Sequence, residues 1–554
     1  MILDYKNYDK IVKKRKKADI LSLISLLLLI LLIIIGILYL ISWKNNRNLQ
    51  SLLFDIQINK IDEYINTHYF FFHPHKAKEA IALSSLVNND YLNAEKFFKE
   101  EIPTDLPYYW GKYAKLLLDK GYYWGANLYL NYLLKGYKNE DLDNFYCIVS
   151  TILNDFMFSN QCIDLVLKNK ELANYALRIK HIKKMGRFNW IIDRNGTSLI
   201  YRKLGSKEIY YDDESMEWFK TEMLKLKGDD FYNTIILTID GRIQRIAYKS
   251  LGKYDGTLLL MSKDGQLLAA TSKSADKESP LFIRMLKPGS IVKIVTLSAA
   301  MRNNLDLKSI FPFECKGFIV PYDKIVFYDW IEHKTVLDVT DALATSCNIS
   351  FGIIGNKLGS KKLKKELEEF GIGKEITLEE MKFKAGEIID KVSDPIYEYS
   401  LAIGDNYVMI SPILAVMWVS SLINDGIAPH PYFMKSKETL TGNNFFNKNS
   451  EIYGKFTNSE YAEVIKDGMI KAVGLDFGTG KRAKLTNYHI ALKTGTAGSK
   501  EPAYDSIIIG YAPNEDPQVA FALFALHSGK ASLEGANIIK NFLEQSLPYY
   551  INKK

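Results

Sequence analysis

The stretch Lys287-Pro288-Gly289-Ser290-Ile291-Val292-Lys293 combines a turn signal with a possible nucleophile and a nearby base. The apolar and small residues of 294–300 follow without a helix breaker, which predicts a buried helix that begins near Ser290. Free backbone N–H groups at a helix N-terminus favour negative charge. Lys293 lies three residues after Ser290 and therefore shares a helix face with it. Burial shifts a lysine toward its neutral form, which is the form that activates a hydroxyl.

The S-x-x-K spacing is weak evidence by itself, because the chain holds it twice more, at Ser250 to Lys253 and at Ser274 to Lys277. Gly252 follows Ser250, and Ser274 lies in a charged run, so neither serine precedes an apolar helix. A surface serine near a lysine is the ordinary interpretation of such a pair. The case for Ser290 therefore depends on motifs further along the chain.

The chain has 554 residues, more than one ordinary domain, and its composition of 47% hydrophobic and 25% charged residues is globular. Its net charge of +8 is concentrated at the N-terminus, where residues 1–18 hold seven Lys and Arg against two Asp. A nucleic-acid-binding tail is the alternative interpretation of this basic cluster. The apolar segment that follows argues against it, so we expect no nucleic acid as a partner.

An apolar segment at Ile20–Ser42 has no charged residue and, at roughly 1.5 Å per residue, is long enough to span a bilayer. Tyr39 and Trp43 lie near its far end, as interface aromatics do. The preceding lysines favour a cytoplasmic N-terminus, with the rest of the chain outside. No A-x-A cleavage site follows, so the pattern predicts a cytoplasmic basic tail at 1–19 and an uncleaved single-pass anchor at 20–43.

The four cysteines of the chain are too few for a disulfide framework at this size. Cys147 and Cys162 are the candidates for a pair. Two buried thiols in neighbouring helices are the other interpretation, and the sequence leaves both open.

Residues 44–186 are rich in Leu, Tyr, Lys and Asn and poor in Pro, which favours an all-α region. A weak repeat aligns residues 86–94 with residues 118–126, with a looser third copy around 153–156. The spacing of about 32 to 35 residues is typical of tetratricopeptide-like helical hairpins. The region is either a partner-binding surface or a spacer that lifts the next domain off the membrane.

The pattern changes near Arg187. An apolar run and an Asn-Gly turn predict a strand and turn over 190–197, and a β-branched run predicts a strand over 235–240. A short helix at 242–247 and a hairpin over 256–271 follow. Strand, helix, antiparallel hairpin and then a long helical region indicate the α+β class.

Two more motifs occur downstream of Ser290. Ser346-Cys347-Asn348 lies between predicted helical segments, and Lys493-Thr494-Gly495-Thr496 follows an apolar strand at 489–492. Strands over 506–513 and 518–526 and a C-terminal helix would complete a sheet.

These three motifs, S-x-x-K after Pro-Gly, S-x-N, and K-T-G-T on a strand, resemble in this order the penicillin-binding protein transpeptidase family, whose fold is shared with serine β-lactamases. The resemblance covers roughly 187–550 and implies a pedestal-like segment at 187–232 and a transpeptidase domain at 233–550. The Trp190–Gly196 segment and the strand over 235–240 are similar to those of monofunctional, class B enzymes. No glycosyltransferase-like segment precedes them.

The resemblance implies a serine D,D-transpeptidase that cross-links peptidoglycan stem peptides and is acylated by β-lactams. Ser290 would attack the penultimate D-Ala carbonyl, and Lys293, kept neutral by burial and by the charge of Lys493, would accept the proton. Ser346 would relay a proton to the departing D-Ala. Asn348 would hold Lys293 and the substrate amide.

The same resemblance implies a binding role for the K-T-G-T strand. Lys493 and the hydroxyls of Thr494 and Thr496 would bind the terminal carboxylate, and the backbone N–H groups of Ser290 and Thr496 would form the oxyanion hole. Gly495 would let the strand edge approach the substrate closely. The chemistry needs no metal or cofactor.

The sequence departs from the family in three places. Gly404-Asp405-Asn406 stands where G-Q-G is frequent, and His333-Lys334 stands where His-Gly is frequent. A frequent second cysteine after Cys315 is absent, so we expect Cys315 to be unpaired. These departures bear on substrate preference and on the rim of the cleft.

Other functions on the same fold are a D,D-carboxypeptidase, a β-lactamase, and an inactive penicillin sensor or scaffold. No residue can be assigned as a dedicated deacylation base, and the anchor favours a wall-building enzyme. The expected location is the cytoplasmic (inner) membrane with a periplasmic catalytic domain. A SEDS-type glycosyltransferase is a candidate partner, while a role in division or in elongation is left open.

Overall fold

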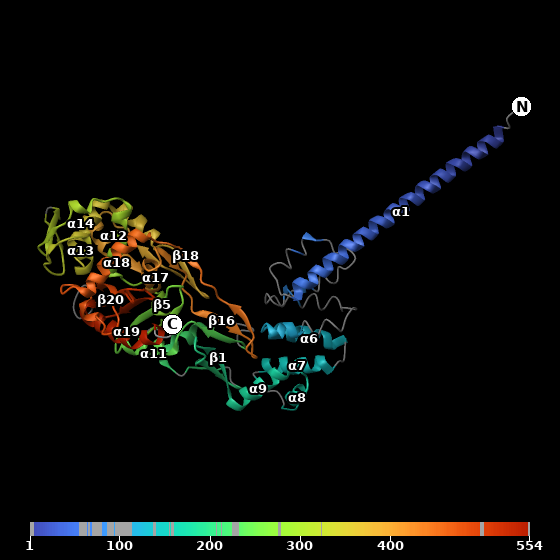
Figure 1. The fold of residues 1–554 in the computed structure, drawn as a ribbon, viewed down its shortest axis with the longest axis horizontal. Helices are drawn as coiled ribbons and strands as arrows, with labels where there is room; N and C mark the ends of the chain where they lie inside the picture. The colour runs from blue at the N-terminus through green and yellow to red at the C-terminus, as the bar shows by residue number, and fades with distance from the viewer. Residues whose placement is uncertain are drawn as a thin grey trace. The chain divides into compact units, whose positions relative to one another are not determined.

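The chain is seen in a computed structural model (Figure 1), which describes residues 5–54, 64, 67, 68, 80–82, 84, 85, 94, 114–136, 140–154, 156, 160–205, 208–211, 213–223, 232–274, 279–322, 324–498 and 504–551. It divides into two compact units. The first comprises Met1–Gly186 together with Thr439–Phe445, and the second comprises Arg187–Glu438 together with Phe446–Lys554.

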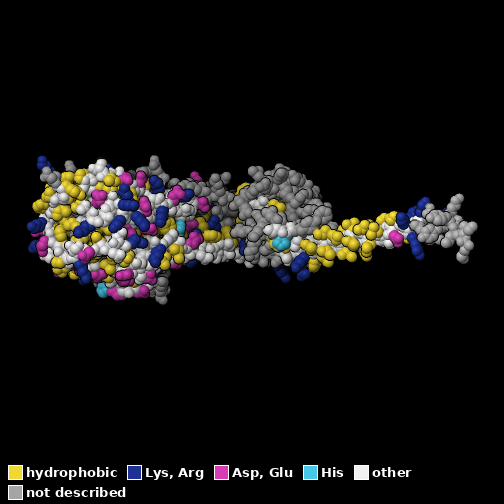
Figure 2. Space-filling model, turned by 90° about the horizontal axis from the view of Figure 1, so that it is seen from above, with side chains coloured by type: hydrophobic (Ala, Val, Ile, Leu, Met, Phe, Trp, Pro, Cys, Tyr) yellow, Lys and Arg dark blue, Asp and Glu magenta, His cyan; other side chains and the backbone are white. Residues whose placement is uncertain are grey.

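The first unit begins with a single long helix, α1 (Tyr5–Phe54). Its segment Lys13–Leu49 contains an 18-residue window with a mean hydropathy of 3.3 and is long and apolar enough to cross a membrane. The apolar side chains of this segment are exposed, for example Leu27 at 57%, and form the yellow rod of Figure 2. Water penalises such exposure, so the helix fits a membrane anchor.

The bounded helices that follow α1 in the described part of this unit are α6 (Tyr123–Gly136), α7 (Glu140–Leu153), α8 (Asn160–Val166) and α9 (Ala173–Met185), and residues 114–119 are helical as well. A disulfide joins Cys147 of α7 to Cys162 of α8, with their Cα atoms 6.1 Å apart, so the two cysteines are a pair rather than separate thiols. The all-α prediction for this region is confirmed for its described part. The first copy of the predicted repeat lies outside the described residues except for Ala94, and the repeat stays a prediction.

The first unit also contains a segment from much later in the chain. Thr439–Phe445 is the tip of the hairpin between β16 (Met434–Glu438) and β17 (Asn444–Asn447). The backbone N–H of Leu440 donates to the hydroxyl of Tyr123 in α6 at 2.9 Å. The helical unit is therefore not continuous along the chain.

The second unit is built on a five-stranded antiparallel sheet in the order β19-β20-β21-β5-β6. Its strands are β5 (Gly256–Ser262), β6 (Leu267–Ala270), β19 (Ala491–Ala497), β20 (Asp505–Ala512) and β21 (Val519–Ala525). Every residue of β5 and β21 is buried, which requires cover on both faces of the sheet. Helices α11 (Gly241–Ser250) and α19 (Ala536–Tyr550) share a core with one face, while α17 (Pro412–Leu422) packs on β5 and β21 outside that core.

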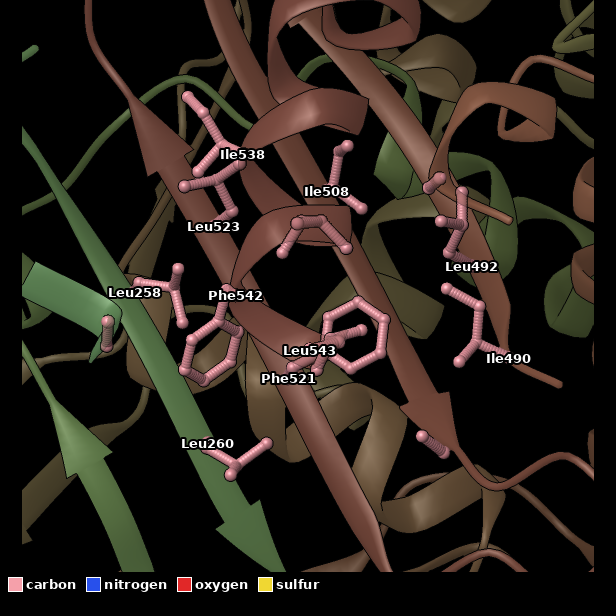
Figure 3. Close-up of a cluster of buried hydrophobic side chains, with 14 of the residues drawn as sticks. Leu258, Leu260, Ile490, Leu492, Ile508, Phe521, Leu523, Ile538, Phe542 and Leu543 are labelled. Atoms are coloured by element: carbon pink, nitrogen blue, oxygen red, sulfur yellow. The ribbon is translucent and has the colours of Figure 1, made fainter. Parts of the chain in front are cut away.

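The core beneath α19 is shown in Figure 3. Phe542 and Leu543 of this helix lie among side chains of the sheet, including Leu258, Phe521 and Leu523. All five are fully buried. Burying a large apolar side chain is worth about 1.5–3 kcal/mol relative to leaving it in water, so this layer holds the C-terminal helix on the sheet.

A second sheet has six strands in the order β17-β16-β4-β1-β2-β3, of which four have not yet been given bounds. These are β1 (Arg187–Ile192), β2 (Ser198–Lys203), β3 (Ile209–Tyr211) and β4 (Thr234–Leu237). The predicted Asn-Gly turn joins β1 to β2, where Asp193 Oδ1 accepts from the N–H groups of Asn195 at 2.8 Å and Thr197 at 2.7 Å. β1 pairs in parallel with β4, which ties Arg187–Ile192 to Thr234–Leu237 although about 40 residues separate them in sequence.

The remaining helices and strands of the second unit surround the site or connect its parts. The helices are α10 (Glu217–Met223), α12 (Lys293–Arg302), α13 (Val339–Thr345), α14 (Asn348–Leu358), α15 (Ser360–Glu369), α16 (Tyr397–Ile403) and α18 (Ser459–Gly474). The strands are β7 (Phe313–Cys315), β8 (Phe318–Tyr322), β9 (Ile325–Tyr328), β10 (Lys334–Val336), β11 (Glu375–Leu378), β12 (Met381–Lys384), β13 (Gly386–Ile388), β14 (Val408–Ile410), β15 (Ile427–Pro429) and β18 (Ile452–Lys455). This mixture of helices and antiparallel sheets confirms the predicted α+β class.

Candidate active site

Ser290 lies in one turn of 3₁₀-helix, Gly289–Val292, which leads directly into α12. The predicted turn and buried helix are thus present, with the α-helix beginning at Lys293. Gly289 has φ +54°, a conformation that favours glycine, and a Cβ there would lie 2.8 Å from the carbonyl oxygen of Thr496. The turn that carries Ser290 therefore packs directly on β19.

Gly495 makes the same close approach from the strand side. A Cβ at this position would lie 2.7 Å from the carbonyl oxygen of Pro288 and 3.3 Å from the backbone nitrogen of Ile291. The sequence interpretation gave Gly495 a close approach to substrate; in the structure the close approach is to the turn that carries Ser290. Any larger residue would push β19 away from that turn.

The S-C-N motif forms the turn between α13 and α14. Ser346 has φ +58°, a left-handed conformation that is uncommon for a residue other than glycine. Cys347 is the N-cap of α14, and its Sγ accepts from the backbone N–H of Ser350 at 3.4 Å. Backbone strain of this kind costs about 1–3 kcal/mol and concentrates at functional sites.

Lys293 is completely buried and bonds to both polar residues of that turn. Its Nζ donates to the carbonyl oxygen of Ser346 at 2.6 Å and to Asn348 Oδ1 at 2.7 Å, and it lies 3.2 Å from Ser346 Oγ. Burial lowers the pKa of Lys293 to about 8, while the charges of Asp329 and Cys347 act in the opposite direction. A substantial fraction of this amine is therefore neutral near pH 8.

Lys493 reaches the same serine from β19. It too is fully buried, and its Nζ donates to Ser346 Oγ at 2.8 Å and to the carbonyl oxygen of Thr494 at 2.6 Å. Burial, and then the positive charge of Lys293, lower the pKa of Lys493 well below its usual value. Ser346 Oγ accepts hydrogen bonds from both amines, so the hydrogen of its own hydroxyl can be donated to a third group.

These residues meet at one cavity of about 310 Å³. Five of the residues predicted from the sequence line it: Ser290, Ser346, Asn348, Thr494 and Thr496. Lys293 and Lys493 lie behind this lining, and both contact it through the hydroxyl oxygen of Ser346. The structure thus brings together three motifs that are separated by up to about 200 residues of sequence.

Comparison with known proteins identifies the family of this constellation. Residues 256–544, more than half of the chain, match the family described as the penicillin binding protein transpeptidase domain. The chain belongs to this family.

The relatives of the transpeptidase domain include Stage V sporulation protein D of Bacillus subtilis, 29% identical over 228 residues, which are 39% of this chain and 34% of that protein. Peptidoglycan D,D-transpeptidase PbpA of Mycolicibacterium smegmatis is 26% identical over 200 residues, or 35% of this chain and 39% of that protein. The match spans well under half the length of both relatives. The crystal structure of the D,D-transpeptidase domain of a peptidoglycan glycosyltransferase from Eggerthella lenta covers 64% of this chain and 98% of that chain, with a TM-score of 0.55 and 22% identity, and shows the same fold.

Six residues of the cavity lining were missed by the motif search: Trp330, Thr479, Gly498, Tyr504, Lys530 and Ser532. Thr479 shows why they matter. Thr494 donates its hydroxyl hydrogen to Thr479 at 2.7 Å. While this bond is in place, the Thr494 hydroxyl can only accept a hydrogen bond from a ligand and cannot donate one. Thr479 lies between α18 and β19, in a segment with no motif that marks it.

The three departures from the family pattern have local structural outcomes. A Cβ on Gly404 would collide with the carbonyl oxygen of Gly289, so the Gly404-Asp405-Asn406 turn packs on the turn that carries Ser290. Burial raises the pKa of Asp405 there, and the charge of Lys287 opposes this shift. Lys334 adopts φ +57°, the conformation that the frequent glycine would take at lower cost. Cys315 is in no disulfide, as predicted.

Proposed function

We propose that this chain is a membrane-anchored serine D,D-transpeptidase that cross-links peptidoglycan stem peptides and is a target of β-lactams. The observation that carries the proposal is the meeting of Ser290, the Ser346 turn and the Lys493 strand at one cavity, with two fully buried lysines behind it. Membership of the transpeptidase family and the name of the relative PbpA support the same activity.

Acylation begins when Ser290 Oγ attacks the carbonyl carbon of the penultimate D-Ala. The hydroxyl proton passes to neutral Lys293, whose burial keeps a usable fraction of the base at physiological pH. The backbone N–H groups of Ser290 and Thr496 stabilise the negative charge on the carbonyl oxygen. The terminal carboxylate lies against the K-T-G-T strand, where the hydroxyl of Thr496 donates to it and the hydroxyl of Thr494 does so once its bond to Thr479 breaks. Lys493 supports this site from behind the cavity lining.

Collapse of the tetrahedral intermediate breaks the amide bond and releases D-Ala. Its nitrogen needs a proton, which Ser346 relays: the Ser346 hydroxyl hydrogen passes to the nitrogen while its oxygen takes the proton that Lys293 gained, across the 3.2 Å between Lys293 Nζ and Ser346 Oγ. This step restores neutral Lys293. Asn348 holds Lys293 and the substrate amide. An amine of a neighbouring stem peptide then attacks the acyl-enzyme, forms the cross-link and frees Ser290.

The experiment is acylation of the purified full-length chain, in detergent, by benzylpenicillin. Opening of the β-lactam ring leaves the leaving group tethered, so the adduct should persist and add the mass of one intact drug. Peptide mapping should place it on the peptide with Ser290 and not on those with Ser250 or Ser274. Ser290→Ala should abolish labelling.

Other outcomes separate the remaining functions of this fold. Rapid loss of the adduct as penicilloate would mean a β-lactamase, and a folded chain without any adduct would mean a scaffold. With a natural stem peptide, release of D-Ala without a cross-linked product would mean a D,D-carboxypeptidase.

We also propose that the N-terminus is cytoplasmic and the catalytic unit periplasmic. The basic residues that precede the apolar part of α1 support this orientation. In spheroplasts, a protease added outside should remove a tag at the C-terminus and spare one at the N-terminus. The reverse pattern would contradict both the orientation and the substrate. A SEDS-type glycosyltransferase in the same membrane is the proposed source of glycan strands.

A further inference from the structure

The cavity is lined by one charged side chain to which the proposed mechanism gives no role. Lys530 lies between β21 and α19 and lines the cavity together with Thr496 and Ser532. Among the lining residues that the structure describes, it is the only one that carries a charge. Lys530 belongs to none of the three sequence motifs, so only the assembled fold brings its charge to the site.

Most of the hydrogen-bond donors of the K-T-G-T strand are already engaged. Lys493 is fully buried, and its Nζ donates to Ser346 Oγ at 2.8 Å and to the carbonyl oxygen of Thr494 at 2.6 Å. The hydroxyl of Thr494 donates to Thr479 at 2.7 Å. A carboxylate that leaves water needs donors in the site, and a charged donor binds it more strongly than a neutral one.

Thr496 is the hydroxyl of this strand whose hydrogen remains available, and the residue after Lys530 holds it. The backbone N–H of Ala531 donates to Thr496 Oγ1 at 3.2 Å. This bond occupies a lone pair of the hydroxyl oxygen, so the hydroxyl hydrogen is left for a ligand. Since Lys530 directly precedes Ala531, its side chain lines the cavity beside this hydroxyl.

Hydrogen bonds on both sides of Lys530 fix its backbone. The N–H of Gly529 donates to the carbonyl oxygen of Tyr504 at 2.9 Å, and Ser506 Oγ donates to the carbonyl oxygen of Gly529 at 2.8 Å. The carbonyl oxygen of Lys530 accepts from the N–H of Glu534 at 3.0 Å. The lysine side chain therefore extends from a backbone tied to the beginning of β20, which lowers the entropy that binding must remove.

We propose that Lys530 binds the terminal carboxylate of the donor stem peptide together with the hydroxyl of Thr496. The inference rests on the proposed function, which supplies this substrate. Lys493 contacts Ser346 and Thr494 from behind the lining, and burial and the charge of Lys293 lower its pKa, so it carries less positive charge. Lys530 then supplies the cation at the carboxylate, while Lys493 organises the residues around it.

The test measures acylation of the full-length chain, in detergent, by benzylpenicillin, whose carboxylate takes the place of the terminal one. Lys530→Gln should lower the second-order rate constant about tenfold, between the effect of an exposed ion pair and that of an enclosed charged hydrogen bond. Lys530→Arg keeps the charge and should recover most of the rate. Lys455→Gln removes an exposed lysine of β18 outside the cavity lining and should leave the rate unchanged.

The methyl ester of benzylpenicillin separates binding of the carboxylate from a structural role of Lys530. The ester has no negative charge, so the wild type and Lys530→Gln should react with it at similar rates. A variant that slows both compounds by the same factor would overturn the proposal. An unchanged rate with benzylpenicillin would overturn it as well.

Carbenicillin, which has a second carboxylate in its acyl side chain, locates the contact. Lys530→Gln should slow carbenicillin and benzylpenicillin by the same factor. A loss confined to carbenicillin would place Lys530 beside residues upstream of the D-Ala pair and overturn the assignment. A wild type without any adduct would contradict the proposed function and this inference together, whereas a normally labelled wild type with an unaffected variant would contradict this inference alone.

Discussion

Replacing Lys293 by alanine is expected to slow the acylation of Ser290 by benzylpenicillin by about 10²–10⁴-fold, the usual contribution of positioned proton transfer. Lys293 is the buried amine that follows Ser290 by one turn and bonds to both Ser346 and Asn348. The rate is measured from the growth of the adduct mass over time. Lys253→Ala, which removes the exposed lysine of another S-x-x-K pair, should leave the rate unchanged and serves as the control.

The pH dependence of the wild-type rate tests the same assignment. In the proposed mechanism the base is the neutral amine of Lys293, and burial lowers the pKa of Lys293 to about 8. Below that pH most of the amine is protonated, so the rate should rise with pH and level off above about 8. A Lys293→Ala rate within a few-fold of wild type, with this pH profile retained, would assign the base to another group.

Replacing Phe542 by alanine is expected to lower the free energy of unfolding of the catalytic unit by about 3–5 kcal/mol, the range measured for buried aromatic residues. Phe542 is fully buried in the layer between α19 and the sheet, and its loss leaves a cavity that the surrounding strands cannot close. Urea unfolding followed by the loss of fluorescent-penicillin labelling reports on this unit alone.

The control for Phe542 is Phe477→Ala. Phe477 is 57% exposed, so its truncation should change the free energy of unfolding by no more than about 0.5 kcal/mol. If both variants unfold at the same urea concentration, the α19 layer does not hold the sheet and helix together.

The parts of the molecule that the sequence predicts well are those with a strong local signal. The residues that α12 buries are apolar or small except for Lys293 and Thr296, and the strands β5, β20 and β21 each contain a continuous apolar run, as expected for a sheet covered on both faces. The α+β class follows from these signals, whereas the meeting of the three motifs at one site was implied by the resemblance to the penicillin-binding protein transpeptidases.

The parts that the sequence could not predict depend on contacts between distant segments. Thr479, Tyr504 and Lys530 line the cavity from stretches without a motif, and only the assembled sheet brings them there. Cys347 stood out only as the middle residue of S-C-N, and its closeness to Cys315 depends on how β7 and α14 pack. Whether Cys147 and Cys162 pair is likewise decided by the packing of α7 on α8.

The hairpin tip at Thr439–Phe445 belongs to the helical unit, although the residues on either side of it in sequence belong to the other unit. Its partner Tyr123 is encoded more than 300 residues earlier, so a single cut in the gene before Arg187 would leave Leu440 without the hydroxyl that it contacts. Recombination that exchanged only the first third of the gene would separate the same pair. Changes in the helices and in the loop between β16 and β17 should therefore be inherited together, and a graft of this helical unit onto another enzyme must carry both pieces of the sequence.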